Sequence, residues 1–129
     1  RKFAHEFIFT PGQMLELADE VGPNVGLLVD SFHCNAAGAP WSHLASIPAS
    51  RIVLVHINDA PALPQPDQQD GVRLLPGEGS LDLAGFLDAL RKTGYAGPVA
   101  VEVFSADLKK LTPAEAARLA RKACAKIGL

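Results

Sequence analysis

The sequence has few cysteines, few aromatic residues and no long apolar run, and each shortage excludes a class of protein. Its two cysteines, Cys34 and Cys124, lie far apart and fit neither a disulfide framework nor a metal knuckle, so we expect a reducing, cytoplasmic setting. One tryptophan and one tyrosine provide no aromatic cluster on which nucleic-acid bases could stack. No apolar run approaches the roughly 20 residues of a membrane span.

Neither sign of charge is in excess. Twelve Lys and Arg residues against 14 Asp and Glu residues give a formal net charge of -2. This balance favours neither nucleic acid nor an anionic membrane surface as a partner. At 129 residues, a single domain over residues 1–129 is the default. Because the chain starts at Arg1 rather than Met, we expect it to be a processed piece or a fragment.

Strand patterns alternate with helix patterns along the chain. The strand segments are apolar without polar alternation, as in parallel sheets that are covered on both faces. Two helices are expected to begin with capping boxes, at Thr10 and at Thr112. A third helix is expected to have Ser80 as its N-cap. A long loop over residues 60–79 separates two of these units, and loops of that length are usually functional. The predicted strands are residues 3–9, 25–29, 52–57 and 98–104, followed by helices near residues 10–21, 41–47, 80–93 and 112–127.

This order, βαβαβαβα, predicts an α/β fold with a parallel sheet. A four-stranded open sheet would satisfy it. A closed (β/α)₈ barrel typically takes about 250 residues, so the chain has the size of half a barrel.

A polar side chain interrupts each apolar strand near its C-terminal end, the edge at which parallel α/β folds place their active sites. Three carboxylates and an imidazole would repel one another there unless a cation neutralised them. One divalent metal ion would leave a charge of about -1, and a set of oxygen and nitrogen ligands suits Mn²⁺ or Mg²⁺, with Co²⁺, Fe²⁺ or Zn²⁺ possible. The four predicted metal ligands are Glu6, Asp30, His56 and Glu102.

Each of these residues also has a simpler interpretation. Glu6 could be an exposed strand end, Asp30 could cap the turn that follows it, and His56 could be a buried core histidine. Glu102 is hardest to explain otherwise, because apolar residues surround it. Cys34 could be a soft metal ligand, although a packed thiol is the commoner role.

Five segments, "AHEF", "VGLLVDSFH", "VHINDAP", "VRLLPGEGSLDL" and "VAVEVFS", closely resemble, in this order, the xylose-isomerase-like barrel superfamily of sugar-phosphate isomerases and epimerases, and within it the inosose isomerase-like branch. The resemblance implies that the chain corresponds to strands five to eight of a TIM barrel and lacks the first half. It also implies two sets of site residues, the metal ligands Glu6, Asp30, His56 and Glu102 and the substrate-contacting residues His33 and Arg73.

The resemblance further implies a reaction through an enediolate. A metal that chelates adjacent carbonyl and hydroxyl oxygens of a polyol would acidify the neighbouring C–H bond. Glu6 and Glu102 would remove and return the proton, as glutamate ligands do in the epimerases of the family. His33, the third predicted catalytic residue, would hydrogen-bond a substrate oxygen and help to place or shuttle a proton, or would merely cap or pack near the loop. Arg73 would grip the substrate or lie solvated at the surface. Asp59 would support His56 or Arg73, or begin a turn.

Other functions stay open. A dehydratase acting beside a carbonyl shares the enolate chemistry. A relative of apurinic endonucleases would need more metal ligands and a basic groove, which the charge balance disfavours. A non-catalytic metal-binding module is a third class. The expected partners are a small sugar or polyol substrate, and either a missing N-terminal half-barrel or a second copy of the chain that covers the open sheet. Neither nucleic acid nor a membrane is expected.

Overall fold

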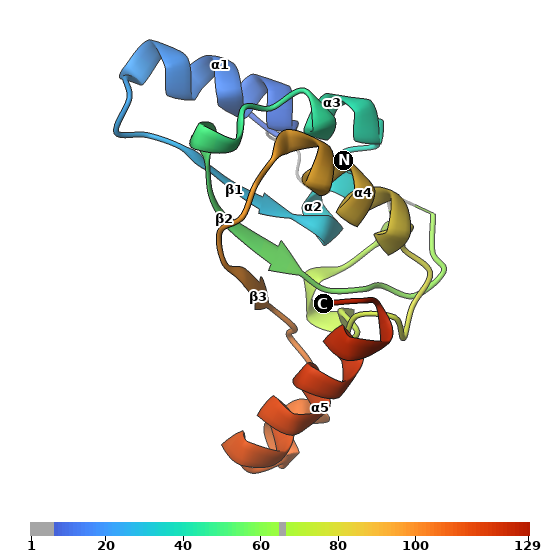
Figure 1. Cartoon of the computed structure of the whole chain (residues 1–129). Helices are drawn as coiled ribbons and strands as arrows, with labels where there is room; N and C mark the ends of the chain where they lie inside the picture. The colour runs from blue at the N-terminus through green and yellow to red at the C-terminus, as the bar shows by residue number, and fades with distance from the viewer. Residues whose placement is uncertain (1–6, 65–66) are drawn as a thin grey trace.

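The described part of the chain, residues 7–64 and 67–129 of a computed structural model, forms a short parallel sheet with helices packed on one face (Figure 1). Strands β1 (Leu27–Asp30), β2 (Ile52–Ile57) and β3 (Val99–Val101) lie side by side in that order. The predicted α/β class with parallel strands is therefore confirmed. The helices are α1 (Pro11–Val21), α2 (Ser31–Ala36), α3 (Trp41–Ala45), α4 (Leu83–Thr93) and α5 (Pro113–Lys126), with 3₁₀ turns at Ala49–Arg51, Asp70–Val72 and Leu108–Lys110.

The strand predicted over residues 3–9 is absent where the structure describes it. Residues 3–6, which include Glu6, lie outside the described ranges, and residues 7–9 form no strand. The backbone N–H groups of Phe9 and Thr10 both donate to Oε1 of Gln13, so they cap α1 rather than pair with a neighbouring strand. The sheet of the described residues therefore has three strands instead of the predicted four.

Two helices begin at the predicted residues. The hydroxyl of Thr10 accepts the backbone N–H of Gln13, and the Gln13 side chain bonds back to Thr10. Thr112 and Glu115 form the same reciprocal pair at the start of α5. Each pair satisfies backbone donors that the first turn of a helix leaves free, which fixes the start of each helix.

The start of α4 differs from the prediction. Its N-cap is Asp82, whose carboxylate accepts the backbone N–H of Gly85 at 2.9 Å. Ser80, the predicted cap, instead donates its hydroxyl to the backbone carbonyl of Ala60 at 3.3 Å. Ser80 thus ties down the preceding loop, and the helix begins two residues later. It ends as predicted, at Gly94 in the left-handed conformation.

One face of the sheet carries the core. Helices α1, α3 and α4 lie over this face (Figure 1), and apolar side chains of β1 and β2 point into the layer between them. Trp41 of α3 meets Phe86 of α4 edge to face, with ring centroids 5.6 Å apart. Because a single helical layer buries these residues, the core lies on one side of the strands. Its buried sheet residues include Leu27, Val29, Ile52, Val55 and Ile57.

The opposite face leads to the polar residues at the strand ends. Leu28 pairs with Leu54 and Asp30 with His56, so the aliphatic pair and the polar pair follow one another along the same face. Leu28 is 50% exposed, which shows that the described residues leave this face open.

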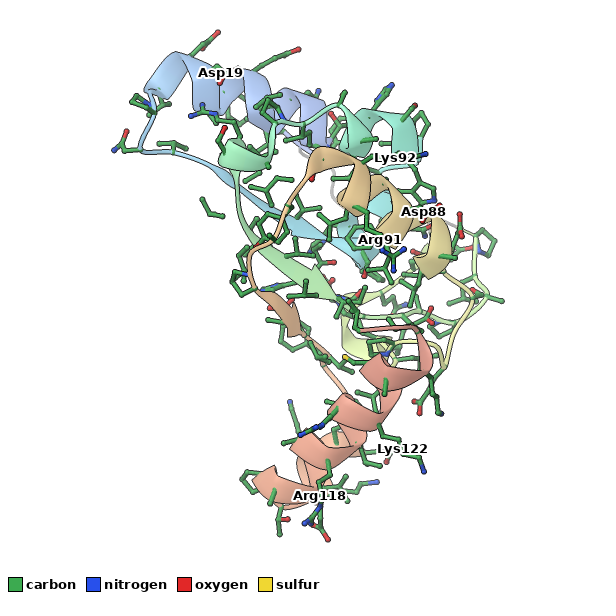
Figure 2. All side chains as sticks on the ribbon, in the orientation of Figure 1. Asp19, Asp88, Arg91, Lys92, Arg118 and Lys122 are labelled. Carbon is green, nitrogen blue, oxygen red and sulfur yellow. The ribbon has the colours of Figure 1, made fainter. Side chains whose placement is uncertain are left out.

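The outer surfaces of the helices are charged. Figure 2 shows such side chains projecting from α1, α4 and α5. Among the described residues no helix is both long and apolar enough to cross a membrane. The labelled charged residues are Asp19, Asp88, Arg91, Lys92, Arg118 and Lys122, all of them exposed.

Candidate metal centre

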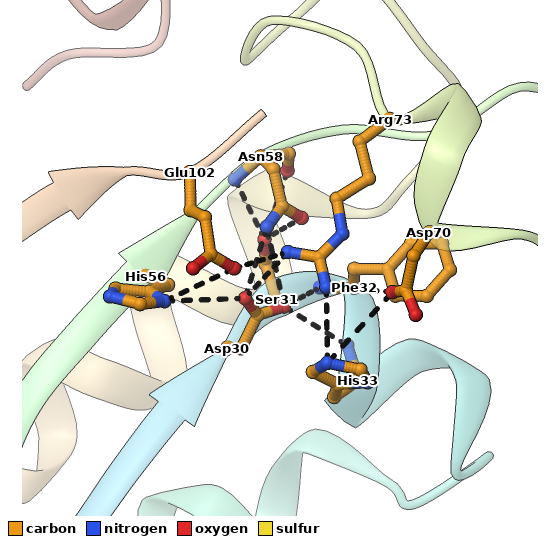
Figure 3. Close-up of polar contacts among 9 residues, drawn as sticks. All are labelled: Asp30, Ser31, Phe32, His33, His56, Asn58, Asp70, Arg73 and Glu102. Carbon is orange, nitrogen blue, oxygen red and sulfur yellow. Dashed lines mark hydrogen bonds and ion pairs between the residues drawn. The ribbon is translucent and has the colours of Figure 1, made fainter. Parts of the chain in front are cut away.

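Three of the four predicted metal ligands meet at the C-terminal edge of the sheet (Figure 3). Asp30 ends β1, His56 lies opposite it in β2, and Glu102 directly follows β3. Nδ1 of His56 is 3.7 Å from Oδ2 of Asp30 and 3.4 Å from Oε2 of Glu102. One ligand atom from each residue lies within 4.8 Å of the others. Glu6, the fourth predicted ligand, lies outside the described residues.

The donor atoms fit a divalent ion. Two ligands that each bind an ion at about 2.0–2.2 Å lie roughly 3–4 Å apart, which is the separation of the His56 nitrogen from both carboxylate oxygens. Two carboxylates and one imidazole suit Zn²⁺, Mn²⁺ and related ions, and three protein ligands leave coordination positions open for others. The described residues could therefore hold such an ion.

The buried charge of Asp30 is compensated by hydrogen-bond donors from the backbone, from Asn58 and from Arg73. Its Oδ1 accepts the backbone N–H groups of Phe32 and His33 at 2.8 and 3.1 Å, which makes Asp30 the N-cap of α2. The side-chain amide of Asn58 donates to Oδ2 at 3.1 Å, and Nη1 of Arg73 donates to the same oxygen at 3.0 Å. Capping and clustering are thus both correct for Asp30. The charge of Asp30 does not by itself require a metal ion, contrary to the prediction, because Arg73 already supplies a cation.

Arg73 lies at the centre of the cluster rather than solvated at the surface. Only 2% of it is exposed. Its Nη1 donates to Oδ2 of Asp30 and to Oε2 of Glu102, the second at 2.8 Å. Its Nη2 donates to Oδ1 of Asp70 at 2.8 Å and contacts Nε2 of His33 at 3.0 Å. The guanidinium therefore links the long loop to β1, α2 and the residue that follows β3.

His33 lies at the rim of the same cluster. Its side chain is 51% exposed, on the first turn of α2. A guanidinium can only donate hydrogen bonds, so the contact with Arg73 requires Nε2 of His33 to accept and its proton to lie on Nδ1. His33 is thus positioned by Arg73 as well as by its helix.

Cys34 is a packed thiol. It is buried in the core cluster, and burial, followed by the neighbouring charge of Asp30, raises its pKa from an ordinary 9.0 to about 12. A thiol that stays protonated at neutral pH is a poor metal ligand, because the thiolate is the form that binds metals. The packed interpretation is therefore the one that the structure supports. Cys34 and Cys124 are both free.

Two residues of the cluster were missed in the sequence. Asn58 is fully buried, donates to Asp30 and accepts the hydroxyl of Ser31 at 2.9 Å. It lies two positions after His56, and strand alternation could have placed it on the same face. Asp70, which binds Arg73, lies in a loop without any periodic pattern, so nothing in the sequence singled it out.

Asp59 binds the backbone of the loop rather than the side chain of His56 or of Arg73. Its two carboxylate oxygens accept backbone N–H groups of Gly77, Gly79 and Leu81 at 2.9–3.0 Å. Its own backbone pairs with Leu74 in an antiparallel bridge. Asp59 therefore fixes the segment that follows Arg73 against the end of β2, and it does so through the backbone of the loop.

Comparison with known proteins agrees with this geometry. The profile of the "Xylose isomerase-like TIM barrel" family matches residues 2–127. The inosose isomerase of Bacillus subtilis is 36% identical over 94% of this chain and 46% of that protein. A 3-dehydroshikimate dehydratase of Pseudomonas putida is 36% identical over 64% of this chain and 13% of that protein. The chain thus spans less than half the length of these relatives.

A solved structure of the same kind contains a metal. The crystal structure of the IOLI protein with a bound zinc atom superposes with a TM-score of 0.86 at 35% identity, over 92% of this chain and 43% of that one. The fold is therefore that of part of a TIM barrel. From the profile match and these similarities it follows that the chain belongs to the xylose isomerase-like TIM barrel family.

Proposed function

We propose that the chain carries the metal site of a sugar isomerase or epimerase that acts on a small polyhydroxy carbonyl compound such as an inosose or a ketose. The observation that carries this proposal is the convergence of Asp30, His56 and Glu102 at the C-terminal edge of the parallel sheet. TIM-barrel enzymes perform their chemistry at this edge. The similarity to inosose isomerases supports the choice of substrate class.

The metal would be held by Asp30, His56 and Glu102, with Glu6 as the fourth ligand. When bound, a divalent ion at these residues would polarise the carbonyl and the adjacent hydroxyl oxygen of the substrate. The oxygen-rich ligand set suits Mn²⁺ or Mg²⁺, and the zinc in the IOLI structure makes Zn²⁺ a third candidate.

Proton transfer falls to the glutamates. A carboxylate oxygen of Glu102, whose side chain is 34% exposed, takes the proton from the carbon next to the carbonyl. The C–H electron pair then forms the C=C bond of an enediolate, and the carbonyl oxygen takes up the negative charge. Delivery of a proton to the opposite face of the same carbon, from a protonated Glu6 that is left ionised, gives the epimer. For the isomer, the hydroxyl hydrogen on that carbon moves to the negatively charged oxygen, and Glu102 returns its proton to the neighbouring carbon, so that the carbonyl moves by one carbon. His33 and Arg73 would hold the substrate oxygens.

Deuterium exchange tests this chemistry directly. In D₂O with added Mn²⁺, we expect an inosose or a ketohexose to acquire deuterium at the carbon next to the carbonyl, followed by NMR. The Glu102→Gln variant should exchange about 10²–10⁴-fold more slowly, because it lacks the base. The matched control is Glu16→Gln, on the exposed surface of α1. Stoichiometric metal binding without any exchange, even with the N-terminal half of a relative added, would contradict the enzymatic proposal.

A dehydratase is the second candidate function, and the similarity to 3-dehydroshikimate dehydratases favours it. It would begin with the same proton abstraction and then expel a hydroxyl group as water. Loss of water from 3-dehydroshikimate, with no exchange in inososes or ketohexoses, would select this activity. If the chain binds a metal ion but catalyses neither reaction, the remaining interpretation is a non-catalytic metal-binding module.

The proposed partner covers the open face of the sheet. Full-length relatives are about twice as long as this chain, and its exposed sheet face points away from α1, α3 and α4. We propose that further β/α units complete the barrel, supplied by an N-terminal half or by a second copy of the chain.

A further inference from the structure

We infer that Arg73 is a built-in cation that competes with the metal ion for the carboxylates of Asp30 and Glu102, and thereby sets the affinity of the site for the ion. This inference rests on the proposed metal site but not on the isomerase activity. Arg73 acts here as a positioning residue, separate from any contact that it makes with a substrate.

The two cations would use the same atoms. Nη1 of Arg73 donates to Oδ2 of Asp30 at 3.0 Å and to Oε2 of Glu102 at 2.8 Å. These are also the oxygens that face Nδ1 of His56 at 3.7 and 3.4 Å (Figure 3). An ion bound by His56 and by both of these oxygens would therefore compete with the hydrogen bonds that the oxygens now accept from the guanidinium of Arg73.

Arg73 is a fixed charge rather than a mobile one. Its guanidinium carbon lies 4.7 Å from the ring centroid of Phe32 and 5.2 Å from that of Phe104. Its Nη2 is hydrogen-bonded to Oδ1 of Asp70 and to Nε2 of His33. Because the group is buried and hydrogen-bonded through both Nη atoms, its charge is screened little by solvent and acts strongly on its neighbours.

The charges explain why both cations suit the site. The carboxylates of Asp30, Asp70 and Glu102 carry three negative charges, and the guanidinium of Arg73 carries one positive charge. The remaining two negative charges are neutralised by a dication. Without Arg73 the carboxylates of Asp30 and Glu102 would face each other unpaired, which is costly near a buried position. Arg73 thus keeps the two ligands close together, and its positive charge opposes the arrival of a second cation.

Calorimetric titration of the purified chain with Mn²⁺, and separately with Zn²⁺, tests the inference. Arg73→Gln should bind Mn²⁺ about tenfold more tightly or better than the unaltered chain, because the competing charge is gone. In the presence of a chelator the same variant should melt at a lower temperature and regain stability when Mn²⁺ is added. The matched control is Arg91→Gln, which removes an exposed arginine of α4 and should change the affinity less than twofold.

Equal or weaker binding of Mn²⁺ by Arg73→Gln would overturn the inference. If the unaltered chain binds neither ion, the proposed metal site itself fails, which is a different result. Should the variant not fold, NMR of the unaltered chain decides. The side-chain N–H signals of Arg73, identified by their proximity to the rings of Phe32 and Phe104, should shift on titration with Zn²⁺. Unchanged signals at saturating Zn²⁺ would also overturn the inference.

Discussion

At the scale of single residues, Asp30 divides two functions between its two oxygens. Oδ1 accepts the first backbone N–H groups of α2, and Oδ2 faces Arg73 and His56. The helix start therefore orients the carboxylate, so that one oxygen points into the cluster. A side chain that is fixed in this way reaches the geometry of a ligand before any ion arrives.

Replacing Asp30 by Asn separates these functions. Asn keeps a carbonyl oxygen for the cap but removes the charge opposite Arg73, so we expect a loss of about 3 kcal/mol in the free energy of unfolding. Urea titration in the presence of a chelator, followed by the fluorescence of the single tryptophan, measures it. The control is Asp88→Asn, which breaks the exposed Arg91–Asp88 pair of α4 and should cost less than about 1 kcal/mol. Equal losses in the two variants would contradict the buried pairing.

At the scale of elements, the loop after β2 is held by one carboxylate. Asp59 accepts three backbone N–H groups of residues 77–81, and its backbone pairs with Leu74. Arg73 directly precedes this clamped segment. The clamp therefore determines where the guanidinium lies relative to the strand ends.

Gly79 is the position at which this clamp can be tested. A Cβ atom there would lie 2.3 Å from the carbonyl oxygen of Ala60 and 2.5 Å from Oδ1 of Asp59, so Gly79→Ala must move the loop. We expect about 2 kcal/mol lower stability, measured by thermal unfolding. We also expect tighter binding of Mn²⁺, because a shifted Arg73 competes less for the carboxylates of Asp30 and Glu102. Gly71→Ala, in the same loop with nothing within 4 Å, should leave both unchanged. Similar behaviour of the two variants would show that the clamp does not position the site.

The elements also show how far the sequence alone leads. Strands β1, β2 and β3 and the polar residues Asp30, His56 and Glu102 were predictable because each shows a local pattern, a short apolar run with one interruption. The same pattern over residues 3–9 predicted a strand that residues 7–9 do not form. The caps at Thr10 and Thr112 were predictable for the same reason. Helix α2 was not, because it is one short segment that follows β1 without a gap, and Asp30 is both the last strand residue and the helix cap.

The electrostatics of the site could be predicted only in part. The sequence shows that Asp30, His56 and Glu102 are out of place in apolar strands, which predicts their convergence. It does not show that Arg73 and Asp70 return from a 20-residue loop to join them, because a loop has no periodicity from which a position can be inferred. The structure therefore supplies the cation that the charge argument lacked.

At the scale of the whole molecule, the open sheet face has a consequence for assembly. Leu28 and Leu54 lie on this face beside the cluster, and exposed apolar sheet surface favours association. If a second copy or an N-terminal half covers the face, the isolated chain should form dimers or bind that half. A monomer that binds no hydrophobic dye would speak against both.

The account depends most on the claim that Asp30, His56 and Glu102 together hold one divalent ion. Native mass spectrometry of the chain with one equivalent of Zn²⁺ or Mn²⁺ measures this directly and also gives the mass of the assembly. The account predicts one ion per chain, retained in a His43→Ala control on the exposed surface of α3 and lost in His56→Ala. An unaltered chain that retains no ion, or a His56→Ala variant that retains it equally well, would contradict the account.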